Sequence, residues 1–338
     1  MAFYHPLLFA LEAERAHRLT IRALSLPLPL PGVERDPRLA TTVAGIDFAN
    51  PVGLAAGVDK DGEAIAGFFG LGFGSVEIGT LTPLPQAGNP KPRLFRLPED
   101  KAVMNRMGFN NGGIDRALAR VAKAKRAGVL GINVGANKDS PDRIADYASA
   151  VARAAPFADY VTINVSSPNT PGLRELQHGA ALDELLAAAR AARGTTPLFL
   201  KVAPDLNTAD IDAIARAALD HGVDALILSN TTVSRQTLKS ANRAESGGLS
   251  GVPLKLLARR RLADFRSATG GGLPLVSVGG IDGPEEAYLR IRGGASLVQL
   301  YTALVYEGPG LGRRIAKGLA RRLARDGFAS VAAAVGTG

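Results

Sequence analysis

From residue 52 onward, short runs of apolar and β-branched residues alternate with Ala- and Leu-rich segments of helical period. This alternation predicts repeated β-α units around a parallel sheet, because strands that helices cover on both faces read as continuous apolar runs. We expect eight strands, at residues 52–55, 75–79, 131–134, 160–165, 198–202, 225–229, 275–278 and 297–300. Eight units favour a closed (β/α)8 TIM barrel. An open, doubly wound sheet is the alternative, since the number of strands alone does not prove closure.

The helices of this repeat can be placed from their apolar period and their end signals. The chain is long enough to bury a large core, with 338 residues of which 46% are hydrophobic. Helices are expected at residues 181–193, 208–221, 254–266 and 284–292. Thr208 is the expected N-cap of the second of these helices, and Gly222 is its expected stop.

Residues 1–40 are expected to form a separate helical extension, with the barrel in residues 41–338. Apolar residues mark helical stripes through HPLLFALEAERAHRLTIRAL, and SLPLPLPG then breaks the helix with three prolines. The extension either caps the bottom of the barrel or lies on a bilayer as an amphipathic piece. Periodicity alone favours the cap. No run approaches the ~20 apolar residues of a membrane span and no signal peptide is apparent, so we expect an intracellular protein.

Composition excludes several classes of function. There is no cysteine, which removes disulfides, thiolate metal sites and any mechanism with a Cys nucleophile or acid. The four histidines lack ligand spacing, so no metal site is expected. The net charge of +9 is concentrated in residues 255–266 and 310–326. Because no aromatic stacking ladder accompanies these basic helices, we expect solvated faces, with acidic lipid as the second choice and no nucleic acid partner.

The ends of the expected strands are polar, and the active site of such a barrel lies at the carboxyl ends of its strands. Hydroxyl and amide residues follow the strands at Thr80, Asn133, Asn164, Ser167, Asn169, Thr170, Ser229, Asn230, Thr231, Tyr301 and Thr302. Asparagine both donates and accepts hydrogen bonds without charge, which suits a planar ring of alternating carbonyl and N–H groups. Lys60 and Lys201 add positive charge. A heterocyclic ligand, together with an anionic substrate or an anionic reduced cofactor, is therefore expected.

Glycines after the sixth and seventh strands indicate a phosphate site. Gly247, Gly248 and Gly251 lie in SGGLSG, and Gly279 and Gly280 lie in VGGID. Exposed backbone amides at this place form the usual phosphate site of barrels. A phosphate-bearing cofactor is expected.

Eleven motifs in order resemble those of the dihydroorotate dehydrogenase family across nearly the whole chain: LAAGVDKDG, VEIGTLTP, KPRLFRL, NRMGFNN, GINVGANK, INVSSPNTPGL, LKVAPDL, SNTT, GGLSG, SVGGID and LVQLYTAL. The resemblance implies an FMN enzyme that oxidises dihydroorotate to orotate in pyrimidine biosynthesis. In this family the soluble class uses a Cys base and the membrane-associated, quinone-reducing class a Ser base. This chain has Ser167 in the matching loop and an extension that resembles the second class at EAERAHRL. Membrane association therefore becomes the preferred interpretation of the extension.

The resemblance also implies the roles of individual residues. Ser167 takes the proton from C5 while hydride leaves C6 for flavin N5, and Thr170 and a water beside Phe109 relay the proton. The implied substrate residues are Lys60, Asn105, Arg106, Met107, Gly108, Phe109, Asn164, Asn169, Asn230 and Thr231. The implied FMN residues are Ala56, Gly57, Lys60, Thr80, Asn133, Asn164, Lys201, Ser229, Gly251, Gly280, Tyr301 and Thr302. Lys201 matches a residue near flavin N1, and Ser229 stands where the family leads us to expect Thr.

The acceptor side of the reaction is implied in the same way. A membrane quinone is expected to enter between the N-terminal helices, with Leu8, Phe9 and Leu11 along its path and His17, Arg96 and Tyr301 near its head group. We expect a bacterial monomer bound peripherally to the cytoplasmic face of the inner membrane. A tRNA dihydrouridine synthase is excluded, because that family needs a Cys. A non-redox barrel enzyme and a non-catalytic peripheral membrane protein are the competing interpretations.

Overall fold

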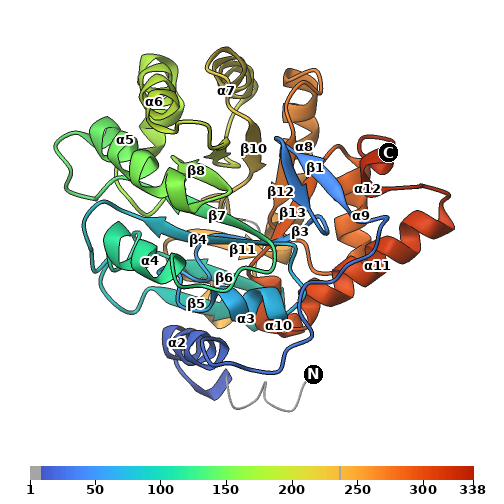
Figure 1. Cartoon of the computed structure of the whole chain (residues 1–338). Helices are drawn as coiled ribbons and strands as arrows, with labels where there is room; N and C mark the ends of the chain where they lie inside the picture. Colours follow the sequence, from blue (N-terminus) through green and yellow to red (C-terminus); the bar gives the residue numbers. More distant parts are fainter. Residues whose placement is uncertain (1–8, 236) are drawn as a thin grey trace.

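The computed structural model describes residues 9–235 and 237–338 and contains a closed barrel of parallel strands (Figure 1). In order around the barrel, the strands are β3 (Val52–Leu54), β4 (Ser75–Leu81), β7 (Val129–Val134), β8 (Tyr160–Asn164), β9 (Leu198–Val202), β10 (Ala225–Leu228), β12 (Leu275–Val278) and β13 (Leu297–Leu300). β13 pairs with β3 and closes the ring. The predicted barrel is confirmed, and the open sheet is wrong.

Helices cover the outside of the barrel. They are α3 (Ile65–Gly70), α4 (Ile114–Val121), α5 (Arg143–Ala154), α6 (Gly179–Ala192), α7 (Thr208–Asp220), α8 (Lys255–Ala268), α9 (Pro284–Arg292), α10 (Ala303–Glu307), α11 (Leu311–Arg325) and α12 (Val331–Ala334). The expected N-cap of α7 is wrong by one residue. Asn207 caps this helix, because its side chain accepts from the Asp210 amide while the Asp210 carboxylate accepts from the Asn207 amide.

The core has two parts, one between barrel and helices and one inside the barrel. Between the strands and helices, side chains such as Ile78 and Leu200 are fully buried. Inside the barrel, the rings of Tyr160 and Phe199 stack with centroids 4.3 Å apart. Burial on both sides explains why the strands are mainly apolar without a regular polar alternation.

A hairpin that the sequence reasoning missed closes the amino end of the barrel. Strands β1 (Thr41–Val43) and β2 (Ile46–Phe48) pair in antiparallel orientation. The two residues between them, Ala44 and Gly45, both have positive φ, as a type I′ turn requires. Val43 and Phe48 are buried against residues near the strand starts, including Val129, Phe199 and Leu297.

The carboxyl end of the barrel is covered by a small sheet and a helix. Strands β5 (Leu94–Leu97), β6 (Ala102–Asn105) and β11 (Gly248–Gly251) form an antiparallel sheet in the order β5, β6, β11. The N-terminal helix α2 (Ala13–Leu24) packs against β5 and α3, and it lies on the side of the molecule away from β1 (Figure 1). The alternative of a cap over the bottom is therefore wrong. In the described part of the chain, every helix is too short or too polar to span a bilayer.

Candidate active site

A cavity of about 670 Å³ lies at the carboxyl ends of the strands, below α2 and the small sheet. Most of the residues that the sequence selected line it together. They are Ala56, Gly57, Lys60, Thr80, Asn105, Met107, Gly108, Phe109, Asn164, Ser167, Asn169, Lys201, Ser229, Asn230, Thr231, Gly251, Gly280, Tyr301 and Thr302, with His17 and Arg96 at the α2 side. Residues far apart in the sequence thus share one enclosed space.

Three residues of the expected catalytic, substrate and FMN sets lie outside this lining. The Arg106 guanidinium turns away, because it binds Glu245 at 2.7 Å and the Pro92 carbonyl at 2.9 Å and lies over the Phe95 ring. Asn133 is fully buried one layer beneath the cavity, where its side chain contacts Thr80 and Asn164. Thr170 is buried in the loop after β8. An Arg106 side-chain contact with a ligand in the cavity is therefore not available in this arrangement.

Asn105 of the small sheet lies beside Asn169 of the loop that follows β8. The Asn169 side-chain amide donates to Asn105 Oδ1 at 3.2 Å. Asn89 supports the same place, since its side-chain amide donates to the main-chain oxygens of Arg106 and Asn169, each at 3.1 Å. β6 and the loop after β8 therefore present their asparagines side by side at the cavity.

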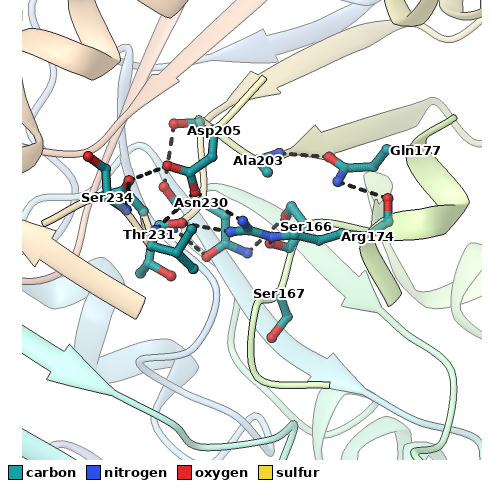
Figure 2. Close-up of polar contacts among 12 residues, drawn as sticks. Ser166, Ser167, Arg174, Gln177, Ala203, Asp205, Asn230, Thr231 and Ser234 are labelled. Carbon is teal, nitrogen blue, oxygen red and sulfur yellow. Dashed lines mark hydrogen bonds and ion pairs between the residues drawn. The ribbon is translucent and has the colours of Figure 1, made fainter. Parts of the chain in front are cut away.

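Ser167 lies on this loop with only 6% of its surface exposed. Its hydroxyl oxygen accepts a 3.3 Å hydrogen bond from the Asn169 backbone N–H. Its side chain points away from the polar network around Arg174 (Figure 2) and lines the cavity. A weakly bonded, buried hydroxyl is thereby left facing the cavity.

Arg174 holds the loop in place (Figure 2). Its guanidinium donates to the Ser166 carbonyl, to Asp205 and to the Thr231 carbonyl, each at 3.0 Å. It therefore ties together the loops that follow β8, β9 and β10. Gln177 adds a further link between the first two of these loops, because it donates to the Arg174 carbonyl and accepts from the Ala203 amide.

Sequence reasoning missed Arg174, Gln177 and Asp205. All three lie in or next to the motifs quoted above, because RELQ directly follows INVSSPNTPGL and Asp205 lies within LKVAPDL, but nothing in the motifs indicates that these residues bind one another. An ionic pair 31 residues apart becomes visible only once neighbouring strands are paired.

Two lysines give the cavity its positive charge, the half-buried Lys60 and the buried Lys201. The Lys60 ammonium donates to the Gly57 carbonyl at 2.7 Å, and burial lowers the pKa of Lys60 to about 8. Burial also lowers the pKa of Lys201, and the Glu77 carboxylate opposes this shift. At neutral pH Lys60 is therefore mostly an ammonium, suited to an anionic ligand.

Two glycines shape a close backbone cradle at the far end of the cavity. At Gly251, with φ of 97°, a Cβ would lie 2.4 Å from the Lys101 carbonyl oxygen. At Gly280, with φ of 71°, a Cβ would lie 2.5 Å from Lys255 Cα, where α8 begins. The start of α8 receives no side-chain cap from any described residue. The Lys255 amide donates to the Val252 carbonyl of the preceding turn, and glycine backbone beside such a helix start is suited to an anion.

The two other glycines of SGGLSG, Gly247 and Gly248, have a different role. Gly248 pairs with Asn105 of β6, and a Cβ on Gly247 would lie 2.3 Å from the Asn105 carbonyl oxygen. Neither lines the cavity. They allow β11 to pack against β6 rather than forming the anion site.

The wall formed by α2 is apolar apart from a few polar groups. Ala16, Leu19 and Leu24 line it, and the His17 and Tyr301 rings lie 6.5 Å apart. Burial, together with Lys60 and Arg18, lowers the pKa of His17 to about 3, so this ring is neutral at physiological pH. Burial raises the pKa of Tyr301 to about 12, so its hydroxyl keeps its proton.

The three residues expected along the quinone path have separate outcomes. Phe9 lines the cavity, with its ring against Tyr306 and the Arg96 guanidinium. The Leu11 carbonyl accepts a hydrogen bond from Arg96. Leu8 lies outside the described residues.

Three buried polar atoms of the cavity residues lack a partner within the described chain. They are Asn110 Oδ1, Thr231 Oγ1 and Gln299 Oε1. A buried polar group without a hydrogen bond costs about 1–3 kcal/mol. These atoms therefore favour a polar ligand that supplies the missing partners.

A closed barrel with a buried, positively charged site at the carboxyl ends of its strands has the arrangement of a barrel enzyme. The sequence model described as dihydroorotate dehydrogenase matches residues 38–323. The chain belongs to the dihydroorotate dehydrogenase family.

Similar proteins cover the chain from end to end. A protein of Erythrobacter litoralis named dihydroorotate dehydrogenase (quinone) is 62% identical over 98% of both chains. A protein of the same name from Sphingopyxis alaskensis is 58% identical over 100% of this chain and 96% of its own. Among solved structures, ligand-free DHODH from Eimeria tenella aligns with a TM-score of 0.92 and 40% identity, over 96% of this chain and 99% of that one.

Proposed function

We propose that this protein binds one FMN, oxidises (S)-dihydroorotate to orotate in pyrimidine biosynthesis and passes the electrons to a membrane quinone. One observation carries the proposal. A single cavity joins the polar strand ends, with Lys60 and Ser167, to the apolar wall of α2, with His17. A two-step redox enzyme needs a substrate site and an acceptor site that share one cofactor, and a continuous cavity supplies both.

The cavity fits FMN. The cradle of Gly251, Gly280 and the start of α8 suits its phosphate. Thr80, Asn164 and Ser229 offer hydroxyl and amide groups for the polar edge of its ring, and Lys201 offers a positive charge near it. Bound FMN takes up the electrons that leave dihydroorotate and delivers them to the acceptor.

The loop after β8 and the small sheet suit the substrate. Lys60 attracts the carboxylate, and the amides of Asn105, Asn169 and Asn230 match the carbonyl and N–H groups of the pyrimidine ring. Ser167 takes the C5 proton. Because serine is a weak base, its proton needs an exit, which we assign to Thr170 and a water beside Phe109.

The α2 wall suits a quinone. Neutral His17 and protonated Tyr301 can donate hydrogen bonds to its carbonyl oxygens, with Arg96 and Phe9 nearby. In the N-terminal unit, residues 1–40, the described part from residue 9 onward exposes apolar side chains, with Leu26 60% exposed and Leu19 and Leu28 above 40%. We assign this unit to peripheral binding at the cytoplasmic face of a bacterial inner membrane, and residues 41–338 to FMN and substrate binding by a monomer.

The test uses purified, anaerobic protein reconstituted with FMN. Dihydroorotate is expected to bleach the flavin absorbance, and a soluble ubiquinone analogue is expected to restore it. Fumarate and NAD⁺ are the matched alternative acceptors, and neither should restore it. Absence of bleaching refutes the substrate assignment, whereas recovery with fumarate or NAD⁺ refutes the acceptor assignment.

A further inference from the structure

Glu77 of β4 is a carboxylate in the interior of the barrel with no exposed surface. It accepts three hydrogen bonds, from Asn133 Nδ2 at 2.8 Å, from the Tyr160 hydroxyl at 3.0 Å and from Gln299 Nε2 at 2.7 Å. The proposed reaction gives it no role. A charge at this depth is costly unless it is well partnered, so its surroundings call for an explanation.

Glu77 fixes the orientation of Asn133. A carboxylate only accepts hydrogen bonds, so Asn133 must present its NH₂ group to Glu77. The Asn133 oxygen then faces the cavity side. There it accepts from the Thr80 hydroxyl at 2.6 Å and from Asn164 Nδ2 at 3.2 Å.

The orientation of Asn133 in turn fixes the orientation of Asn164, which lines the cavity. Because Asn164 turns its NH₂ group toward Asn133 and Thr80, its oxygen faces the opposite way. That oxygen accepts from the Ser166 hydroxyl at 2.8 Å, and Ser166 in turn accepts from Asn230 Nδ2 at 2.9 Å. Every donor from Asn230 to Asn133 therefore points along one chain that ends at Glu77.

We propose that Glu77 is a positioning residue, whose carboxylate sets the direction of this chain and so the pattern of donors and acceptors that the cavity offers to FMN and substrate. An amide can turn by 180° at little steric cost, and the wrong orientation presents a donor where an acceptor is needed. Anchoring the chain on a pure acceptor removes that freedom. Glu77 also faces the charge of Lys201. The inference rests on the proposed function for the identity of the ligand.

The test compares three variants of the full chain by FMN dissociation constant and by melting temperature. Glu77→Gln keeps the shape but replaces one acceptor oxygen by a donor. Tyr160→Phe is the matched control, because it removes a donor from Glu77 while leaving the branch to Asn133 unchanged. Glu77→Gln combined with Asn133→Asp moves the carboxylate one position along the chain. The introduced glutamine then donates to the introduced aspartate, so the bond between positions 77 and 133 is reversed, but position 133 still presents an acceptor to Thr80 and Asn164 and the direction of the chain on the cavity side is preserved.

We expect Glu77→Gln to weaken FMN binding by about tenfold or more, in line with one misdirected buried polar group, and Tyr160→Phe to change it by less than about threefold. The double variant is expected to recover most of the loss. A purely structural role predicts that both single variants act alike and that the double variant is worse than either.

The outcomes separate this inference from the proposed function. If wild-type protein does not bind FMN, the proposed function fails before any variant is compared. If wild type binds FMN and Glu77→Gln binds it equally well, the inference is overturned. Should Glu77→Gln not fold, the double variant decides, because folded, FMN-binding protein supports the inference and unfolded or flavin-free protein overturns it.

Discussion

Replacing Arg174 with methionine removes the guanidinium that joins three loops but keeps most of the aliphatic stem. The variant loses one charge-assisted hydrogen bond to Asp205 and two hydrogen bonds to carbonyls, each 3.0 Å long. The side chains of Arg174 and Asp205 are 23% and 16% exposed, so water replaces part of the lost hydrogen bonding in the variant. Counting about 1.5–2 kcal/mol for the charged pair and about 0.5–1 kcal/mol for each carbonyl, we expect the free energy of unfolding to fall by about 2.5–4 kcal/mol.

The functional effect should exceed the effect on stability. Ser167 is the next residue after Ser166, whose carbonyl Arg174 holds. A displacement of about 1 Å in a reacting group can cost about 100-fold in rate. We therefore expect dihydroorotate to bleach the flavin of Arg174→Met at least about tenfold more slowly at saturating substrate, as measured by anaerobic stopped flow.

Arg143→Met is the matched control for this prediction. Arg143 donates to the Pro171 carbonyl of the same loop at 2.8 Å, but at an exposed position. Its loss should cost less than about 0.5 kcal/mol and leave the bleaching rate near that of wild type. If Arg174→Met and Arg143→Met have the same melting temperature and the same bleaching rate, the assignment of Arg174 as the residue that holds the loop in place is wrong.

Three further predictions concern ligand binding. Because the Lys60 ammonium attracts a carboxylate and the pKa of Lys60 is about 8, orotate binding should weaken as pH rises through about 8, by at most tenfold per pH unit, in titrations of the flavin spectrum. A pH-independent dissociation constant from about pH 6 to about pH 10 contradicts this. Gly280→Ala places a Cβ 2.5 Å from Lys255 Cα, so it should lower the FMN content of the purified protein. Full FMN occupancy in this variant would show that the glycine cradle does not hold the phosphate. His17→Ala should raise the KM for quinone about tenfold while leaving the rate of flavin bleaching by dihydroorotate unchanged. Slower bleaching would show that His17 acts in the oxidation of dihydroorotate and not in the reduction of quinone.

The barrel could be predicted because its strands and helices carry simple periodic signals. Strand β10, with the sequence ALIL, is buried along its whole length and is an unbroken apolar run, and strands such as β9 and β13 are apolar apart from one polar residue each. The hairpin of β1 and β2 and the sheet of β5, β6 and β11 are built from strands of three or four residues. Runs this short do not show a clear alternation, and β11 pairs with a strand far away in the chain.

The site could be predicted as a set of residues but not as a geometry. Polar residues after parallel strands converge at one end of the barrel, which is why Lys60, Ser167 and Asn230 share a cavity. The direction of a side chain depends on its surroundings. Arg106 turns to Glu245, a residue of a distant loop, and Asn133 points to the buried Glu77. Neither contact has a local signal in the sequence.

The central claim is that Ser167 removes the substrate proton during flavin reduction. The most direct test measures the rate of anaerobic flavin bleaching by dihydroorotate in wild type and in Ser167→Ala, together with dihydroorotate affinity. The account predicts a rate at least about 100-fold lower in the variant, with affinity nearly unchanged, because the base is lost while the binding groups stay in place. A variant that bleaches as fast as wild type would contradict it.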